Sequence, residues 1–366
     1  MKKILFFIDS LGYGGAEKVL VNLVNNMDKS KYDITLMTIF DIGVNKQYLL
    51  PHINYKYIFK KLIRGNVLLC KCFTPKFLYK HLIKDRYDTI ISYLEGNTTR
   101  ILSGCPYTDT KKLAWIHVEM DERTRYYPYR SKRECRDCYA KYDKIVGVSQ
   151  NVIESYEAHL GYSDKLCIRY NTVDSDYIRA KSIEKIDDIS IDKSVPMLVS
   201  VGRLIEQKSY KRLLRIHKRL TDEGIKHKLY IIGEGEQKPD LEKYISDNDL
   251  SQSAYILGFR DNPWKYVKAA DLFVCSSWKE GFSTAVTEAL ILGVPCISTN
   301  CSGAYELLGH NNEYGIVTEN SEDGIYEGLY RMLSEDGLLE HYRGQALERG
   351  NKFDKELTVK AVEEIL

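Results

Sequence analysis

An alternation of apolar and helical segments between residues 272 and 298 constrains the fold of this chain more than any other feature. An apolar run at 272–276 is followed by a short acidic turn, a helical segment at 284–292 and a second apolar run at 294–298. Gly293 and Pro295 end the helical segment, because neither residue continues a helix well. Strand, turn, helix and strand in this order predict a βαβ unit, which places ligands at the carboxyl ends of its parallel strands.

Two glutamates lie within this unit, Glu280 in the turn and Glu288 about two helical turns further on. This spacing lets both carboxylates face one cleft, beside the unpaired backbone N–H groups of residues 282–285 at the helix start. Such a site suits a ligand that has many hydroxyl groups and carries negative charge. The alternative is that both glutamates are solvated charges on a surface helix.

The length of 366 residues predicts two domains, since a single hydrophobic core rarely grows to this size. Strand-like runs alternate with helical segments on both sides of a polar stretch at 174–194, which we interpret as a linker. We therefore predict an α/β protein with two doubly wound halves. The N-terminal domain is expected at 1–175, the C-terminal domain at 195–351 and a terminal helix at 352–366. Strands are expected at 4–8, 34–38, 89–93, 112–117, 144–149, 197–201, 228–232, 254–257, 272–275, 295–298 and 315–317.

A glycine-rich loop with Gly12, Gly14 and Gly15 follows the first predicted strand, and a helix is expected to begin at Ala16. A strand, a glycine turn and a helix start together form a site that accepts anions. The glycine spacing differs from that of a dinucleotide-binding fingerprint, so the pattern does not indicate a dinucleotide site.

Several short motifs follow one another through the C-terminal half. They are Val201-Gly202-Arg203-Leu204, Glu206-Gln207-Lys208, Ile232-Gly233-Glu234-Gly235, Leu257-Gly258-Phe259, the segment from Glu280 to Glu288, Gly293-Val294-Pro295 and Tyr314-Gly315-Ile316-Val317. In this order the set resembles the C-terminal domain of retaining glycosyltransferases of family four, and Gly14-Gly15-Ala16-Glu17 is similar to that family's first loop. The resemblance implies the GT-B fold, in which two Rossmann-like domains face a central cleft and the last helix crosses back to the N-terminal domain.

The resemblance implies that Arg203 and Lys208 hold the diphosphate of a nucleotide-sugar donor, while Gly14 and Gly15 approach the donor phosphates and the acceptor. The planar fork of arginine and the mobile ammonium of lysine can hold a diphosphate without a metal ion. The segment Asp174-Ser175-Asp176 has the spacing of a metal-binding motif, but it lies in the predicted linker. No metal site and no cofactor are therefore expected.

The resemblance also assigns the donor-sugar hydroxyls to Glu280 and the ribose hydroxyls to Glu288. The resemblance also implies that the sugar and the phosphate contact the backbone at Phe282, Ser283 and Thr284. The nucleobase would contact Gly258, Phe259 and Arg260. The family commonly has glycine where this chain has Ser209 and Ser283. The resemblance implies close packing of the donor sugar at both positions, so the two serines bear on which sugar the donor carries.

His117 and Glu280 are the two candidates for a catalytic role. His117 ends the apolar run 113–116, where the family has a histidine that faces the donor sugar and the acceptor; a structural histidine is the alternative. Glu280 is the nearest nominal nucleophile, yet the resemblance gives it a binding role. The favoured mechanism is front-face attack by the acceptor, with the leaving phosphate acting as base.

Charge is distributed unevenly along the chain. Residues 1–175 carry a net charge of +9 and the remainder −7, and the stretch 42–84 has nine Lys and Arg but no acidic residue. Its interleaved leucines, isoleucines and phenylalanines favour an interfacial helix at an anionic membrane surface. The alternative is an ordinary helix pair that packs on the sheet. No apolar run reaches the roughly 18–20 residues that cross a bilayer.

Nine cysteines are present, and Cys275 and Cys296 fall in predicted buried strands. Cys135 and Cys138 have the spacing of half a zinc site, but no second pair stands at a suitable distance. We therefore expect free thiols in a reducing cytoplasm. From the basic stretch 42–84 we expect a peripheral position on the inner face of the plasma membrane.

The sequence thus predicts a metal-independent retaining glycosyltransferase that uses a UDP-hexose or a UDP-N-acetylhexosamine. The expected acceptor is a glycan or lipid-linked saccharide in the synthesis of a bacterial capsule, O-antigen or other surface polysaccharide, and no nucleic-acid partner is expected. The alternatives are a GDP-mannose-dependent mannosyltransferase, a nucleotide-sugar epimerase of the same fold and a non-catalytic carbohydrate-binding protein.

Overall fold

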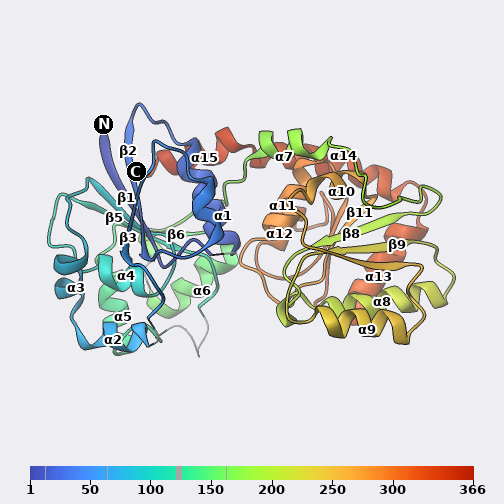
Figure 1. The fold of residues 1–366 in the computed structure, drawn as a ribbon, viewed down its shortest axis with the longest axis horizontal. Helices are drawn as coiled ribbons and strands as arrows, with labels where there is room; N and C mark the ends of the chain where they lie inside the picture. The colour runs from blue at the N-terminus through green and yellow to red at the C-terminus, as the bar shows by residue number, and fades with distance from the viewer. Residues whose placement is uncertain (13, 64, 121–125, 162) are drawn as a thin grey trace. The chain divides into compact units, whose positions relative to one another are not determined.

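The computed structural model describes residues 1–12, 14–63, 65–120, 126–161 and 163–366. The chain forms two compact units (Figure 1). Unit 1 comprises Met1–Val173 and Lys355–Leu366, and unit 2 comprises Asp174–Asp354. None of the described helices is long and apolar enough to cross a membrane.

Unit 1 is built on a parallel sheet with the strand order β3-β2-β1-β4-β5-β6-β7. The central strand β1 is buried from Ile4 to Ile8, as expected for a parallel strand covered on both faces. The strands are β1 (Lys2–Ile8), β2 (Tyr32–Phe40), β3 (Asn54–Phe59), β4 (Thr89–Ser92), β5 (Lys111–Ile116), β6 (Lys144–Gly147) and β7 (Leu166–Ile168). The helices are α1 (Gly15–Asn26), α2 (Asn66–Cys72), α3 (Pro75–Leu82), α4 (Asn97–Leu102), α5 (Lys132–Tyr139), α6 (Gln150–Leu160) and α15 (Lys355–Glu363), with 3-10 turns η1 (Val44–Tyr48) and η2 (Ser163–Lys165).

Unit 2 is built on a second parallel sheet, in the order β10-β9-β8-β11-β12-β13. Its strands are β8 (Met197–Val201), β9 (Lys228–Ile232), β10 (Ala254–Gly258), β11 (Leu272–Cys275), β12 (Cys296–Thr299) and β13 (Ile316–Thr318). Its helices are α7 (Ser175–Ser182), α8 (Tyr210–Asp222), α9 (Lys238–Asp247), α10 (Trp264–Ala269), α11 (Thr284–Ile291), α12 (Ala304–Leu308), α13 (Glu322–Ser334) and α14 (Leu338–Gly350), with 3-10 turns η3 (Glu206–Lys208) and η4 (Asn351–Phe353).

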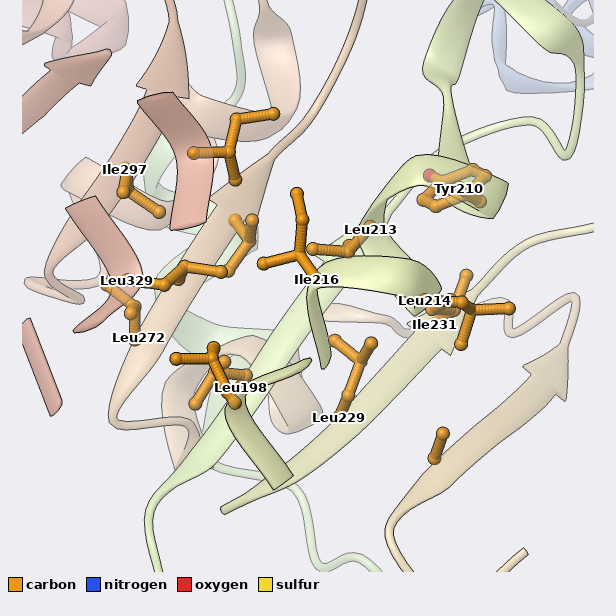
Figure 2. Packing of buried hydrophobic residues seen from close by; sticks show 14 of the residues in the cluster. Leu198, Tyr210, Leu213, Leu214, Ile216, Leu229, Ile231, Leu272, Ile297 and Leu329 are labelled. Carbon is orange, nitrogen blue, oxygen red and sulfur yellow. The ribbon is translucent and has the colours of Figure 1, made fainter. Parts of the chain in front are cut away.

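Helices cover both faces of the second sheet. α8 packs with α9 and α13 on one face, while α7, α10, α11 and α14 pack together on the other. Figure 2 shows the first of these layers, where Leu213 and Ile216 of α8 face Leu198 of β8 and Leu229 of β9. Burial of these aliphatic side chains positions the loops at the carboxyl edge of the sheet.

The predicted α/β fold with two doubly wound Rossmann-like domains is confirmed. The last helix also returns to the N-terminal domain, because the Asp28 amide donates to Glu363 Oε1 at 2.9 Å and Arg169 Nε donates to the Ala361 carbonyl. Cys275 and Cys296 are buried, as predicted, and all nine cysteines are free thiols.

The structure differs from the sequence prediction in three segments. The stretch 174–194 was predicted as a linker, but it contains α7, which begins where the Asp174 side chain accepts from the Tyr177 amide. The segment 42–84 is not one interfacial helix, since the edge strand β3 occupies Asn54–Phe59 ahead of α2 and α3. The third difference is β7, an edge strand of three half-buried apolar residues, which is too short to give a distinct strand signal in the sequence.

Candidate active site

In both units some of the candidate residues follow the strands at which the strand order reverses. In unit 2 the chain passes from β8 outward through β9 and β10, then returns to the other side of β8 as β11. In unit 1 the corresponding strands are β1 and β4. Because all the paired strands are parallel, the loops that follow them gather at one edge, where open α/β sheets bind ligands.

Lys208 and Glu280 form an ion pair at this edge of unit 2. Lys208 lies in η3 after β8, Glu280 lies in the turn after β11, and Lys208 Nζ is 2.6 Å from Glu280 Oε1. Ser277 Oγ donates to the same carboxylate oxygen at 2.6 Å. Both ions are largely buried, with side chains 21% and 11% exposed, and they line one pocket together with Ser283. Three of the predicted site residues, Lys208, Glu280 and Ser283, thus line one pocket, and their roles stay predictions.

The ion pair keeps the lysine charged. Burial is the largest single influence and acts to lower the pKa of Lys208, but the charge and hydrogen bond of Glu280 together with the neighbouring Cys275 and Cys301 outweigh it, so the pKa of the ammonium group is raised. Two buried thiols, Cys275 and Cys301, adjoin the pair. Cys301 hydrogen-bonds to Cys275 and lowers the pKa of Cys275, against the effect of burial. The pocket therefore holds charged and polar groups beside apolar side chains such as Phe273 and Val274 at the sheet edge.

Helix α11 starts at the predicted position and presents its first turn to this pocket. The Ser283 side chain caps the helix by accepting from the Val286 amide at 3.4 Å. Phe282 is buried, and its ring lies 6.0 Å from that of Phe353. Thr284 is the first helical residue. The glycine-to-serine departure at residue 283 therefore supplies a helix cap in addition to occupying space.

Glu288 is buried on the same helix. Its Oε2 accepts a hydrogen bond of 2.8 Å from Trp264 Nε1 on α10, and its side chain is 8% exposed. A buried carboxylate needs such a donor, because an unpaired charge away from water is costly. Sequence reasoning did not identify Trp264, because nothing in the motif order connects α10 with α11.

Arg203 is exposed after β8, and Gly258 ends β10 with φ of +73°. Phe259 is 62% exposed, while Arg260 donates to Asp188 at 2.9 Å and to the Leu257 carbonyl. Gly258 to Arg260 thus lie at the carboxyl edge of the sheet, two strands away from β8. Their assignment to the nucleobase stays a prediction.

Ser209, the second glycine-to-serine departure, lies between Lys208 and α8 with a left-handed backbone, φ 57° and ψ 37°. Only glycine adopts this conformation without strain. The family's preference for glycine at this place therefore has a backbone reason in this chain.

His117 follows β5 in unit 1 and is buried, 8% exposed. Burial lowers the pKa of His117 to about 4, although a hydrogen bond with the Tyr93 backbone acts in the opposite direction. The imidazole is therefore neutral at pH 7. Within the described part of the chain its Nε2 has no hydrogen-bond partner, while its backbone amide donates to Glu95 Oε2 at 2.9 Å.

Two acidic residues accompany His117 that sequence reasoning missed. Asp9 follows β1, and Glu95 follows β4. Burial raises the pKa of Asp9 to about 6, with a further contribution from the charge of Glu17, and burial also raises the pKa of Glu95. The sequence positions of Asp9 and Glu95 could have identified them, since each carboxylate comes directly after an apolar strand.

The predicted glycine loop precedes α1. Gly14 is the N-cap of α1, Gly15 begins the helix, and a Cβ at Gly14 would lie 2.0 Å from Glu17 Oε2. A side chain at Gly14 would force the flexible Glu17 carboxylate to shift. The loop therefore brings Glu17 close to the backbone at the same edge of the sheet as His117.

Comparison with known proteins shows what the chain is similar to. The family profile of glycosyl transferases group 1 matches residues 182–349, and that of glycosyltransferase family 4 matches residues 13–177. The N-acetylgalactosamine-N,N'-diacetylbacillosaminyl-diphospho-undecaprenol 4-alpha-N-acetylgalactosaminyltransferase of Campylobacter jejuni is 30% identical, over 97% of this chain and 96% of its own. The lipopolysaccharide 1,6-galactosyltransferase of Salmonella typhimurium is 26% identical, over 93% and 92%.

Solved structures share the fold over the whole chain. Anabaena HepE in complex with UDP has a TM-score of 0.75 at 16% identity, and covers 99% of this chain and 98% of its own. A glycosyltransferase from Rickettsia africae has a TM-score of 0.80 at 15% identity, with 100% and 97% covered.

Proposed function

Because the chain belongs to glycosyltransferase family 4 and has the GT-B fold, we propose that it transfers a hexose or N-acetylhexosamine from a UDP-sugar to a lipid-linked saccharide. The transfer retains the anomeric configuration, needs no metal ion and serves the synthesis of a bacterial surface polysaccharide. The UDP assignment is supported by the ligand of HepE, and the lipid-linked acceptor by the diphospho-undecaprenol in the name of the Campylobacter relative.

The Lys208–Glu280 ion pair is the observation that carries this proposal. Glycosyl transfer builds negative charge on the departing diphosphate and positive charge on the sugar ring, so the enzyme must stabilise both. Lys208 supplies a buried cation for the diphosphate, and Glu280 supplies a carboxylate for the sugar hydroxyls. Since the two charges compensate each other, neither ion is left unpaired away from water in the preorganised pocket.

Two further groups complete the proposed donor site. Arg203 is exposed, so its guanidinium is accessible to the diphosphate. Glu288, whose carboxylate accepts a hydrogen bond from Trp264, binds the ribose hydroxyls. The exposed Phe259 offers a ring face to the nucleobase.

In unit 1 the neutral His117 positions the acceptor. Its low pKa leaves it unprotonated and a weak base at pH 7, and its buried Nε2 suits a hydrogen bond with a sugar hydroxyl. The proton of the attacking hydroxyl then passes to the leaving phosphate on the same face of the sugar, which accounts for retention without a protein nucleophile.

The test is a screen of UDP- and GDP-sugars for thermal stabilisation, followed by transfer assays with the stabilising donor, because a ligand that binds the folded state raises its stability. We expect a UDP-sugar to stabilise the protein, nucleotide release to require an acceptor, EDTA to have no effect and NMR of the product to show retention. Stabilisation by GDP-mannose alone would favour the mannosyltransferase. Conversion of the sugar without any acceptor would favour the epimerase, and an inverted product would refute the proposed mechanism.

A further inference from the structure

The turn that leads to Glu280 is held by side chains from four other segments of unit 2. Residues 276–279 connect β11 with Glu280 and form neither helix nor strand. Each of their backbone carbonyls accepts a side-chain hydrogen bond of 2.6–2.9 Å, and the donors, in chain order of the acceptors, are Arg212, Thr299, Asn320 and Gln207. A segment without regular backbone pairing is fixed through such outside partners. We call residues 276–279 the carbonyl turn.

Further contacts tie the carbonyl turn to the loop that carries Lys208. The Trp278 amide donates to the Gln207 carbonyl at 2.8 Å, and Ser276 Oγ donates to the Lys208 carbonyl at 3.0 Å. The two loops that supply the ion pair are therefore joined along their backbones as well as through the pair itself. The geometry of the pair thus depends on where the carbonyl turn is held.

Arg212, at the start of α8, reaches the carbonyl turn in three ways. Its Nη2 donates to the Ser276 carbonyl at 2.6 Å, and its guanidinium carbon lies 3.6 Å from the centre of the Trp278 ring. The guanidinium also donates to the side-chain oxygen of Asn320 at 2.9 Å and to the Asn320 carbonyl at 3.3 Å. These bonds orient Asn320, whose amide nitrogen donates to the Trp278 carbonyl at 2.9 Å. One planar fork thus holds the turn directly, by stacking and through Asn320.

Arg212 is buried although it carries a charge. It is 2% exposed, and among the described residues no ion pair forms at its guanidinium, since the neighbouring Glu322 pairs with Arg215 at 2.7 Å. Within the same described part of the chain its Nε has no hydrogen-bond partner. Burying a cation without an opposite charge is costly, and an apolar side chain would fill the space at lower cost. What the fork holds, the carbonyl turn, accounts for an arginine at this position.

We propose that Arg212 is a positioning residue for glycosyl transfer, which holds the carbonyl turn so that Glu280 stays in place beside Lys208 before the donor binds. Arg212 is not among the described residues that line the pocket, so it acts through the turn and not on the substrate. Charges fixed in advance need no rearrangement in the transition state. The inference rests on the proposed function, because it requires that the ion pair acts on the donor.

Hydrogen exchange tests the positioning without any donor. Arg212→Met removes the fork, so amides in a peptide covering residues 276–281 should exchange roughly tenfold faster or more, as expected for losing a hydrogen bond to a charged group. Arg215→Met is the matched control, because it makes the same change three residues further along α8 at a half-exposed ion pair. Its exchange at 276–281 should equal that of the wild type. Unchanged exchange in Arg212→Met, or an equal rise in both variants, would overturn the proposal.

Transfer kinetics with the UDP-sugar found in the donor screen tests the consequence. Arg212→Met should lower kcat roughly 10²-fold with a much smaller change in donor KM, since a shift of about 1 Å in a group that acts in the transition state can cost this much. In a Glu280→Ala background the same substitution should change kcat by no more than about twofold, because a residue that acts through Glu280 then has nothing to position. An equal loss in both backgrounds would indicate a general structural defect and overturn the proposal.

Two further variants keep the test decisive. Arg212→Lys keeps the charge but not the planar fork, so it should recover only a small part of the lost kcat, and full recovery would overturn the proposal. If Arg212→Met does not fold, Asn320→Ala removes one link to the carbonyl turn at a half-buried position and should raise exchange at 276–281 to a smaller extent. A wild type that is inactive with every UDP- and GDP-sugar would overturn the proposed function and the kinetic role of Arg212 with it, whereas the exchange result would still decide whether Arg212 holds the turn.

Discussion

Lys208 Nζ lies 2.6 Å from Glu280 Oε1 across the two neighbouring strands β8 and β11, 72 residues apart in the chain. Each residue follows its strand at the point where the strand order reverses. The pair therefore brings to one place the cation and the carboxylate of the proposed donor site.

Glu280→Ala and Lys208→Ala should each remove most transferase activity while the fold is kept. Losing one charge that acts in the transition state typically costs about 2.7–4 kcal/mol, or roughly 10²–10³ in kcat. Steady-state kinetics measures the loss, and circular dichroism checks the fold. The exposed residues Lys226 and Glu242, changed to alanine, serve as controls. Near-wild-type turnover in a folded variant would reject the role assigned to that residue.

Trp264→Phe should weaken UDP binding by removing the 2.8 Å hydrogen bond to Glu288 while keeping an aromatic ring. Hydrogen bonds to charged groups are worth about 1.5–3 kcal/mol, so Kd should rise roughly tenfold or more. Isothermal titration calorimetry measures the change. Trp278→Phe is the control, because that exposed tryptophan stacks on Arg212 at 3.6 Å and its ring is kept. Equal affinities for UDP in the two variants would show that Glu288 does not bind the ribose.

Ser209→Gly should stabilise the protein. The left-handed conformation of Ser209 costs about 1–2 kcal/mol, and the greater freedom of glycine in the unfolded chain offsets about 0.4–1 kcal/mol of that gain. Ser283→Gly should do the opposite, since it removes a helix cap worth a few tenths of a kcal/mol. Differential scanning calorimetry should therefore show Tm changes of opposite sign, and changes of the same sign would contradict this account.

Asp9→Asn should become more stable relative to the wild type as pH rises. Because the pKa of Asp9 is raised from 3.8 to about 6, the folded wild type keeps this proton between those pH values while the unfolded chain loses it. The contribution of Asp9 to stability is therefore lost as pH rises from about 4 to 6. The depressed pKa of His117 acts in the opposite direction, but it is present in both proteins and cancels in the difference. A difference in Tm that is constant between pH 4 and 6.5 would contradict the buried state of Asp9.

The parts of the site that sequence reasoning located follow from chain topology. Lys208 and Glu280 each stand after an apolar strand, and parallel strands necessarily bring such positions to one edge. The start of α11 was also predictable, because Gly293 and Pro295 bound the helix and Ser283 is a strong N-cap residue.

The parts that were missed depend on tertiary contacts. The bond between Trp264 and Glu288 joins two helices whose sequences carry no pairing signal. The strand β3 is an edge strand with exposed residues, so its polar and aromatic sequence lacks the apolar run of a central strand. Burial of Asp9 likewise arises only when residues distant in sequence close around it.

The return of α15 to unit 1 means that unit 2 is an insertion within the N-terminal domain. Exchange of unit 2 between relatives therefore requires a cassette with two junctions, at Val173/Asp174 and at Asp354/Lys355. A chimera with one junction would instead set α15 of one parent against α1 of the other. It would lose the matched contacts that Glu363 makes with Asp28 and that Ala361 makes with Arg169.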